Sequence, residues 1–567
     1  MYKILDAVLS LQADNPLGLP VIRSVRQTVP IKGTSIRSGV FFVITEREVL
    51  DFGRRLAAHP RLRFLEKVRY NVLAANFLYP PTKEPGTLPY PDRAELTLYD
   101  YTNNIGYLVT AHFPTARWVE VTPMKEQPLY FSEVEYRDAV QILTRDPNFG
   151  EPLRRGTAFC SPGMPAVVHE AAPDSPLGRL DVMPSYVPSH RCTVVQVHYG
   201  RGSGLDGRTA LFMIDLVDQT VVGYTNTVGD FAPAACGGPP SGSSCGSVGG
   251  STWQALSWGP WSMMVRRPAG TRTSEQNSGA GVELRDVFYN GRLVIRRAGM
   301  PVLNVFYDGN SCGPYRDWLY SENCFKCTGT DIGNGLRVAD PNTNVRTICE
   351  DMNDAGTLRG VAVYEDAGEL VLISECDAGW YRYITGWRFH PSGIIRPRFM
   401  YGYTDSSCVC RGRLHNAIWR IHFALDGQGG LMVEEYDAPR GSRAGRWTPI
   451  VMEARRLRYP DRDRRWRVRK LSTGFTAEIV PGAKDGLHEA FTTGEGDVWV
   501  MRYKPGSGGL DAEVSGSGGS WANISQYVNG EKTVDQDLVV WYGAHLRKRG
   551  ADTFECPPLG PDIILSG

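Results

Sequence analysis

The sequence predicts two small α+β units followed by one large antiparallel β-sandwich. Three observations support this fold class: a helix-and-strand pattern that occurs twice before residue 240, a Gly-, Ser- and Pro-rich stretch at 236–251, and many short strand-like runs beyond it. We therefore expect domains at 1–125, 126–240 and 241–567.

The duplication rests on two helix starts of the same kind. A Ser or Thr is followed three residues later by Glu at 45–48 and again at 132–135, which is a capping box. Each apolar-periodic run then stops at a proline, Pro60 or Pro147, with the same spacing from cap to proline. Strand-like alternation follows each predicted helix, at 94–99 and 118–121 and then at 193–197 and 210–214.

The third region consists of short β-branched and aromatic runs separated by turn residues. The stretch at 236–251 is too rich in Gly, Ser and Pro to hold a core, so we interpret it as a linker or long loop. The run 287–289 precedes Asn290-Gly291, a strong hairpin signal, and 370–374 is typical of a strand. Regular short strands over a region of this length predict a large β-sandwich.

Composition and charge exclude several classes of partner. The 567 residues carry 62 basic and 61 acidic side chains, a net charge of +1, and no basic block suited to tracking phosphates. We therefore expect no nucleic-acid partner. No stretch approaches the roughly 18 apolar residues of a membrane span, and no signal-like segment is visible, so we expect no membrane partner and a cytoplasmic location by default. The twelve cysteines leave the compartment open.

Several segments resemble copper amine oxidases in register. Residues 286–298 are similar to the strand pair that opens the catalytic domain of that family, and 524–530 and 537–542 are similar to its C-terminal signature. The two small units correspond to the two small N-terminal domains of the family, so the resemblance covers nearly the whole chain. It implies a copper amine oxidase-like antiparallel β-sandwich and a homodimer joined through that sandwich.

The resemblance also implies a chemistry whose parts can be sought in this sequence. Enzymes of the family oxidise primary amines to aldehydes, and they release ammonia and hydrogen peroxide. They use topaquinone, made from one of their own tyrosines beside a copper ion held by three histidines, and a carboxylate base that removes the α-proton.

The position of the quinone precursor falls on Tyr381. The Asn-Tyr-Asp/Glu motif of the family is replaced here by Trp380-Tyr381-Arg382, counted back from the segment 389–393. Tyr307 keeps the place of the tyrosine that would hydrogen-bond the quinone. Because an indole and a cation replace the polar neighbours that orient the ring, we expect Tyr381 to be unmodified.

The copper ligands are incomplete. The family's His-x-His falls on 413–415, where Arg413 replaces the first ligand with a group that cannot ligate at neutral pH, while His415 remains. His545 is the candidate for the third ligand, although a short deletion is needed to align it. The Cys-x-Cys at 408–410 offers an alternative, softer metal site.

The catalytic base falls in a shortened segment. The expected position lies on Ser321 or Asn323, and Asp317 or Glu322 could replace the base if the loop shifts, so four candidates stay open. The cysteines beside this segment resemble the conserved disulfide of the family, which implies a bond between Cys327 and Cys349.

These changes predict a repurposed enzyme that acts on a small organic substrate, which can carry an amine, with no cofactor. The side chains that would supply acid–base and electrostatic catalysis are Tyr381, Tyr307, Asp317, Arg382 and Arg413. Two arginines added to a buried site would need an anion or a carboxylate.

Two other functions remain open from the sequence. The first is a genuine copper amine oxidase, with copper at His415 and His545 and topaquinone derived from Tyr381. The second is a non-catalytic binding or scaffold protein whose pocket is filled by Trp380 and its neighbours.

Overall fold

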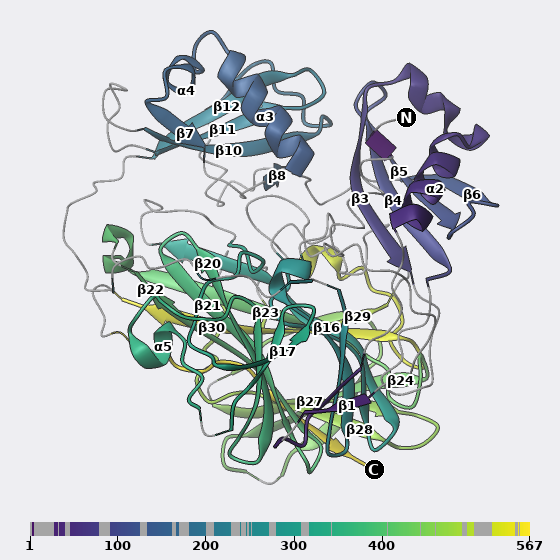
Figure 1. The fold of residues 1–567 in the computed structure, drawn as a ribbon, viewed down its shortest axis with the longest axis vertical. Coiled ribbons are helices and arrows are strands. Elements are labelled where there is room, and N and C mark those ends of the chain that lie inside the picture. The colour runs from purple at the N-terminus through teal and green to yellow at the C-terminus, as the bar shows by residue number, and fades with distance from the viewer. Residues whose placement is uncertain are drawn as a thin grey trace.

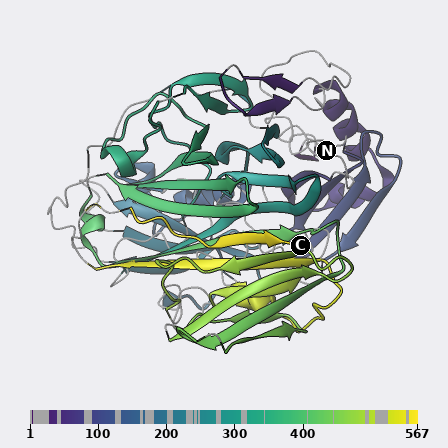
Figure 2. The same ribbon diagram turned by 90° about the horizontal axis from the view of Figure 1, so that it is seen from below.

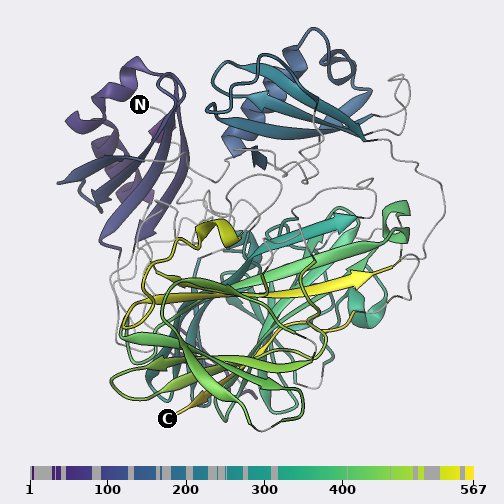
Figure 3. The ribbon, with the colours of Figure 1, turned by 180° about the vertical axis from the view of Figure 1, so that it is seen from behind.

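The computed structural model describes residues 3–4, 28–31, 33–39, 46–78, 91–124, 133–160, 166–168, 181–199, 209–227, 239, 245, 249–250, 252–271, 279–307, 317–341, 343–404, 406–442, 444–459, 461–489, 496–503, 524–549, 554 and 556–567. Figure 1 shows two small units on one side of a large β-sandwich, and the view from behind in Figure 3 shows the same arrangement.

The sandwich consists of a ten-stranded and an eleven-stranded sheet, seen as stacked layers in Figure 2. In spatial order the first sheet contains β1 (Thr28–Pro30), β2 (Arg37–Gly39), β13 (Gln254–Trp258), β14 (Trp261–Arg266), β15 (Glu283–Tyr289), β16 (Arg292–Tyr307), β23 (Arg413–Phe423), β30 (Leu538–Lys548), β29 (Val498–Arg502) and β26 (Ala454–Arg456). The second contains β17 (Gly329–Gly333), β18 (Leu336–Ala339), β19 (Val361–Asp366), β20 (Glu369–Ala378), β21 (Tyr381–His390), β22 (Ile394–Tyr403), β31 (Asp562–Ser566), β28 (Thr476–Val480), β27 (Arg462–Lys470), β24 (Leu431–Pro439) and β25 (Arg446–Ile450).

One apolar core fills the space between the two sheets. Side chains from both sheets contribute to it, including the fully buried tryptophans Trp261, Trp387, Trp419 and Trp466. Burial of such large side chains is the main stabilising contribution of the sandwich. A second, smaller core lies on the other face of β21 and contains Ile348, Ile373 and Ile384.

The two small units each combine helices with an antiparallel sheet. The first contains α2 (Glu46–Ala57), the 3₁₀ helix η1 (Pro60–Lys67), β3 (Tyr70–Leu78), β4 (Arg93–Asp100), β5 (Ile105–His112) and β6 (Val119–Pro123). The second contains α3 (Glu133–Arg145), α4 (Glu151–Arg154), β7 (Ala158–Cys160), β8 (Ala166–Val168), β9 (Asp181–Val182), β10 (Cys192–Tyr199), β11 (Thr209–Asp215) and β12 (Thr220–Thr227). Both predicted helices are confirmed, but the predicted caps Thr45 and Ser132 lie outside the described residues.

A buried ion pair joins the two small units. Glu135 of α3 and Arg191 are both fully buried, and the Arg191 Nη2 donates to Glu135 Oε2 at 2.9 Å. Tyr101 of the first unit donates its hydroxyl to Glu135 Oε1 at 2.7 Å, and the Arg191 guanidinium lies 4.9 Å from the ring centroid of Tyr99. The pair therefore fixes the first unit against the second.

The N-terminal strands differ from the predicted domain boundary. β2 pairs with β13, with Ser38 opposite Leu256, so β1 and β2 extend the large sandwich although they precede the first small unit in sequence. The predicted start of the first domain at residue 1 is therefore wrong for these strands, because backbone hydrogen bonds to the edge strand β13 join them to the large sandwich. The boundaries at 125 and 240 stay predictions.

Beyond residue 251 the described chain is almost entirely β. The predicted hairpin is confirmed: Tyr289 lies opposite Arg292, and the turn residues Asn290 and Gly291 have φ values of 49° and 76°, as a tight turn with two positive φ values requires. The remaining short helices are α5 (Ile348–Asp351), η3 (Pro268–Thr271), η5 (Ser407–Cys410) and η6 (Ile524–Tyr527). Within the residues given above, none of the helices has the length and apolar character that a bilayer crossing requires.

Candidate functional site

Tyrosines and one histidine gather on the core-facing side of β21, β22 and β23. Tyr381 lies opposite Tyr403, and Tyr383 lies opposite Tyr401. Directly opposed residues of an antiparallel pair share a face, and all four side chains are buried. The His415 ring stacks on Tyr401 with centroids 3.9 Å apart and meets the Tyr381 ring edge-on at 4.7 Å. We call these five residues the tyrosine–histidine cluster.

A chain of hydrogen bonds ends on the Tyr381 oxygen. The indole Nε1 of Trp380 donates to Tyr307 Oη at 3.0 Å, and the Tyr307 hydroxyl donates to Tyr381 Oη at 3.0 Å. Burial raises the pKa of Tyr381 above its ordinary value, and Arg413 and the bond from Tyr307 offset this only in part. The Trp380 indole therefore packs beside the phenol and supplies a donor through Tyr307.

Asp317 places a carboxyl group against the same cluster. Its backbone N–H donates to Leu303 O of β16 at 2.9 Å, and its side chain accepts the hydroxyl proton of Tyr383. Tyr383 Oη also lies 3.2 Å from His415 Nε2. Burial raises the pKa of Asp317 to about 7, although the Tyr383 bond opposes this shift. A carboxyl group that titrates near neutral pH is suited to accept or donate a proton.

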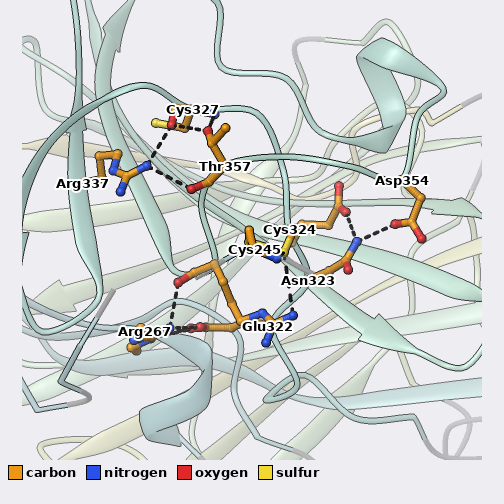
Figure 4. The surroundings of a disulfide bond; sticks show 11 residues. Cys245, Arg267, Glu322, Asn323, Cys324, Cys327, Arg337, Asp354 and Thr357 are labelled. Carbon is orange, nitrogen blue, oxygen red and sulfur yellow. Dashed lines mark hydrogen bonds and ion pairs between the residues drawn. A yellow bond between two sulfur atoms is a disulfide. The ribbon is translucent and has the colours of Figure 1, made fainter. Parts of the chain in front are cut away.

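The structure separates Asp317 from the other candidates for the base, which are Ser321, Glu322 and Asn323. The Glu322 carboxylate is buried and paired with Arg267, whose Nε lies 2.9 Å from Oε1 (Figure 4). The Asn323 amide donates to Asp354 at 2.6 Å and to Glu375 at 2.7 Å. Among the four, Asp317 is the one whose side chain contacts the tyrosine–histidine cluster in the described part of the chain.

The two predicted histidine ligands lie on opposite faces of their sheet. His415 is paired in register with Leu546, whereas His545 is paired with Asn416 and its Nδ1 lies 2.7 Å from the Asn416 amide oxygen. Successive residues of a strand point to opposite sides. His545 instead approaches Asp497, with Nε2 3.1 Å from Oδ1. The prediction that His415 and His545 hold one metal ion is therefore wrong.

Two cations, Arg413 and Lys548, lie near His415. Arg413 is fully buried on the same face as His415, and Lys548 lies opposite Arg413 in register. The Lys548 Nζ lies 5.4 Å from the Tyr401 ring centroid. Burial, and then Arg413 and Lys548, lower the pKa of His415 well below its ordinary value, so this imidazole is neutral.

This set of residues does not fit copper. A guanidinium has no lone pair to offer a metal, and a neutral imidazole flanked by two cations gives one ligand where the family supplies three. The Nε2 atom of His415 lies 3.2 Å from Tyr383 Oη, and its Nδ1 atom has no hydrogen-bond partner within the described residues, so this imidazole offers a metal at most one ligand atom.

Arg382 points away from the cluster. Its Nε and Nη2 atoms donate to the two oxygens of Asp354 at 2.7 and 2.6 Å, and its Nη1 donates to Asp377 at 3.0 Å. Because Arg382 follows Tyr381 directly on β21, its side chain lies on the opposite face of the sheet. Arg382 therefore forms a buried structural ion pair with Asp354. The prediction that Arg382 is a catalytic group beside Tyr381 is wrong.

The disulfides differ from the predicted pairing. Cys349 bonds to Cys556, 207 residues later, and Cys324 bonds to Cys245 of the Gly-rich stretch, while Cys327 is a free, buried thiol. Figure 4 shows the Cys327 segment held instead by the Thr357 hydroxyl, which donates to its carbonyl oxygen at 2.7 Å. The Cys327–Cys349 prediction is therefore wrong, because Cys349 at the start of α5 faces the C-terminal segment.

The Cys-x-Cys at 408–410 offers no soft metal site. Cys408 and Cys410 are both disulfide-bonded, so neither is a thiolate that could bind a metal. A different cluster, His190, Asp215 and Asp218 in the second small unit, brings its possible ligand atoms within 4.8 Å of one another among the described residues. The Asp215 carboxylate accepts a hydrogen bond from the backbone N–H of Asp218 at 2.9 Å. This bond stabilises the turn after β11 and explains the position of the carboxylate without a metal.

Part of the cluster was missed by sequence reasoning. Two successive strands carry tyrosines at every second position: Tyr383 on β21, and Tyr401 and Tyr403 on β22. This period-two aromatic pattern on both sides of one hairpin could have indicated them. Lys548 carries no comparable signal, since only its register with Arg413 places it in the site.

Comparison with known proteins identifies the fold. No protein-family profile matches the chain, and no curated protein matches its sequence. Among solved structures, it is similar to a copper-containing benzylamine oxidase from Hansenula polymorpha, with 12% identity and a TM-score of 0.52 over 88% of this chain and 93% of that one. It is also similar to a lysyl oxidase from Pichia pastoris, with 10% identity and a TM-score of 0.52 over 96% and 92%. The chain therefore has a copper amine oxidase-like fold.

Proposed function

We propose that this protein is an enzyme that uses the copper amine oxidase-like fold for acid–base chemistry on a small organic substrate, without copper or a quinone. The observation that carries the proposal is the buried Asp317, with a pKa of about 7, in contact with Tyr383 and through it with His415. The substrate can carry an amine, as the resemblance suggests.

Asp317 is the proton acceptor or donor in this proposal. Near neutral pH its carboxyl group is divided between the acid and the carboxylate, which is the condition for efficient proton transfer. Its Oδ1 has no hydrogen-bond partner within the described residues, so one oxygen is free to meet a substrate proton while Oδ2 is held by Tyr383. Tyr383 fixes the orientation of Asp317 and connects it to the neutral His415.

Tyr381 and Tyr307 provide polar groups beside that carboxyl. The donor chain from Trp380 through Tyr307 supports negative charge developing on the Tyr381 oxygen, and Arg413 supports it electrostatically. Such an arrangement suits reactions in which a C–H proton is removed and charge develops on a neighbouring oxygen. Elimination, condensation and cyclisation all belong to this class.

Copper analysis tests the quinone-free part of the proposal. We expect protein produced with added copper to contain far less than one copper per chain and to show no hydrazone band after phenylhydrazine. Stoichiometric copper together with a hydrazone band would instead identify a working amine oxidase with a ligand set outside the described residues.

Proton exchange tests the enzymatic part. Small keto and amino compounds are incubated with the protein in D₂O, and deuterium incorporation beside the carbonyl group is followed by NMR. We expect incorporation with at least one compound and its loss in Asp317→Asn, whereas Glu322→Gln, which alters a buried carboxylate outside the cluster, retains it in proportion to the folded fraction. Exchange that is equal in wild-type and Asp317→Asn proteins would contradict the role of Asp317.

We also propose that the protein is a homodimer joined through the large sandwich. The support is the resemblance of the chain to copper amine oxidases. Sedimentation equilibrium at micromolar concentration would give twice the chain mass of 62.8 kDa if the proposal is right and the chain mass itself if it is wrong.

A further inference from the structure

Arg413 is a buried cation whose charge is unmatched within the described residues. Its exposed fraction is 0%, and none of the acidic side chains in the described chain forms an ion pair with it. Nη1 donates to the carbonyl oxygens of Val409 and Arg411, while Nε and Nη2 have no acceptor there. Burying a charge without a partner is costly, so an arrangement of this kind indicates a missing anion.

The two free donors lie on one edge of the guanidinium. Nε and Nη2 point in parallel from the same side of the group, which is the edge that binds the two oxygens of a carboxylate. Arg382 shows this geometry in the same protein, since its Nε and Nη2 hold both oxygens of Asp354 at 2.7 and 2.6 Å. Arg413 offers the same edge with the carboxylate absent.

We propose that Arg413 binds the carboxylate of a small organic acid, and that such an acid is the substrate class of this site. The inference rests on the proposed function and deepens it. The Arg413 Cζ lies 5.3 Å from the Tyr403 ring centroid, so aromatic surface adjoins the free edge and suits an organic anion. Arg413 lies two residues from His415 on the same face of β23, and Tyr383 contacts both His415 and Asp317, so an acid bound at Arg413 lies near the proposed proton acceptor.

A carboxylate fits better than a phosphate. Two parallel donors match the planar carboxylate, whereas a phosphate dianion needs further donors and a second free cation. Nη1 of Arg413 is already occupied by backbone carbonyls, and Lys548 is engaged in contacts of its own. The site as described therefore offers one charge and one bidentate edge.

Calorimetric titration of the full-length protein tests the inference with three probes: sodium benzoate, benzylamine and inorganic phosphate. We expect benzoate to bind and the other two not to bind. Arg413→Lys keeps the charge but removes the bidentate edge, so benzoate affinity should fall by about tenfold or more. Arg420→Lys is the matched control, because Arg420 is a buried arginine of the same strand on the opposite face. It should leave benzoate affinity unchanged.

Three outcomes would overturn the inference: no benzoate binding to the wild-type protein, tighter binding of phosphate than of benzoate, or equal benzoate affinity in wild-type and Arg413→Lys proteins. Benzoate binding to protein that also carries copper and reacts with phenylhydrazine would sink the proposed function but leave the carboxylate site intact. Lack of benzoate binding in copper-free, phenylhydrazine-silent protein would sink the carboxylate site alone.

Thermal unfolding of Arg413→Met separates a binding role from a structural one. Removal of an unmatched buried charge should raise the midpoint of the ligand-free protein, and benzoate should no longer shift it. A structural arginine would give a lower midpoint than wild type. A lower midpoint combined with an unchanged benzoate shift would contradict the inference.

Discussion

Arg382 and Arg413 are both buried arginines of the large sandwich, yet their surroundings differ. Arg382 holds Asp354 with two hydrogen bonds on the outer side of β21. Arg413 faces the tyrosine–histidine cluster and has two donors without partners among the described residues. The difference teaches that a buried cation is interpretable only together with its counter-charge: a satisfied one supports the scaffold, and an unsatisfied one indicates a ligand.

The largest expected difference between the two arginines appears when each is replaced in turn. Arg382→Met leaves the Asp354 carboxylate buried without its cation, so we expect a loss of about 3–5 kcal/mol in the free energy of unfolding. Arg413→Met removes an unmatched charge and should be neutral or stabilising. Urea denaturation of the two variants measures both values. Equal losses would show that the two arginines are equivalent structural groups.

Asp317 allows a test on the cluster side, because the stability of the folded protein should depend on pH through this residue. Its pKa in the folded protein, about 7, is raised from the ordinary 3.8, so the folded state binds more protons than the unfolded state between these values and loses stability as pH rises through about 7. Asp317→Asn removes this loss. The variant should therefore gain stability relative to wild type between pH 5 and pH 8, by on the order of 3 kcal/mol at most.

The measurement for Asp317 is denaturant unfolding of both proteins across that pH range. Glu375, whose pKa burial also raises to about 7, is common to both proteins and cancels in the difference. A difference between variant and wild type that does not change with pH would contradict the buried, titrating Asp317.

The outer side of β21 carries a second scaffold element that can be tested. Cys349 bonds to Cys556 beside α5, whose Ile348 backbone N–H donates to Glu375 at 2.7 Å. Cys349→Ser should cost about 2–5 kcal/mol because it removes this cross-link, whereas Cys327→Ser should cost about 1 kcal/mol. Mass spectrometry of non-reduced peptides should recover Cys349 joined to Cys556. A peptide joining Cys327 to Cys349 would contradict the structure.

The smallest expected effect concerns the donor chain on the cluster side. Trp380→Phe removes the indole N–H that Tyr307 accepts, and a net loss of about 1 kcal/mol is expected for one such bond. A double-mutant cycle with Tyr307→Phe measures whether the two residues are coupled. Strictly additive losses would show that the indole contributes only its packing.

Much of the scaffold could be predicted from local patterns. The helices α2 and α3, the strands of the small units and the hairpin at Asn290-Gly291 follow from capping, periodicity and turn chemistry, which act over a few residues. The place of Tyr381 beside Tyr307 followed from motif spacing. The N-terminal strands β1 and β2 could not be assigned in this way, because their partner β13 lies more than 200 residues later.

The sequence by itself determined which chemical groups are present, among them Tyr381, His415 and Arg413. The tertiary structure decided which of these groups meet. It placed His415 and His545 on opposite faces, turned Arg382 outward, selected Asp317 among four candidates and joined Cys349 to Cys556. The physical reason is that a one-residue step on a strand reverses the side a residue faces, and that contacts between distant segments depend on register rather than on spacing.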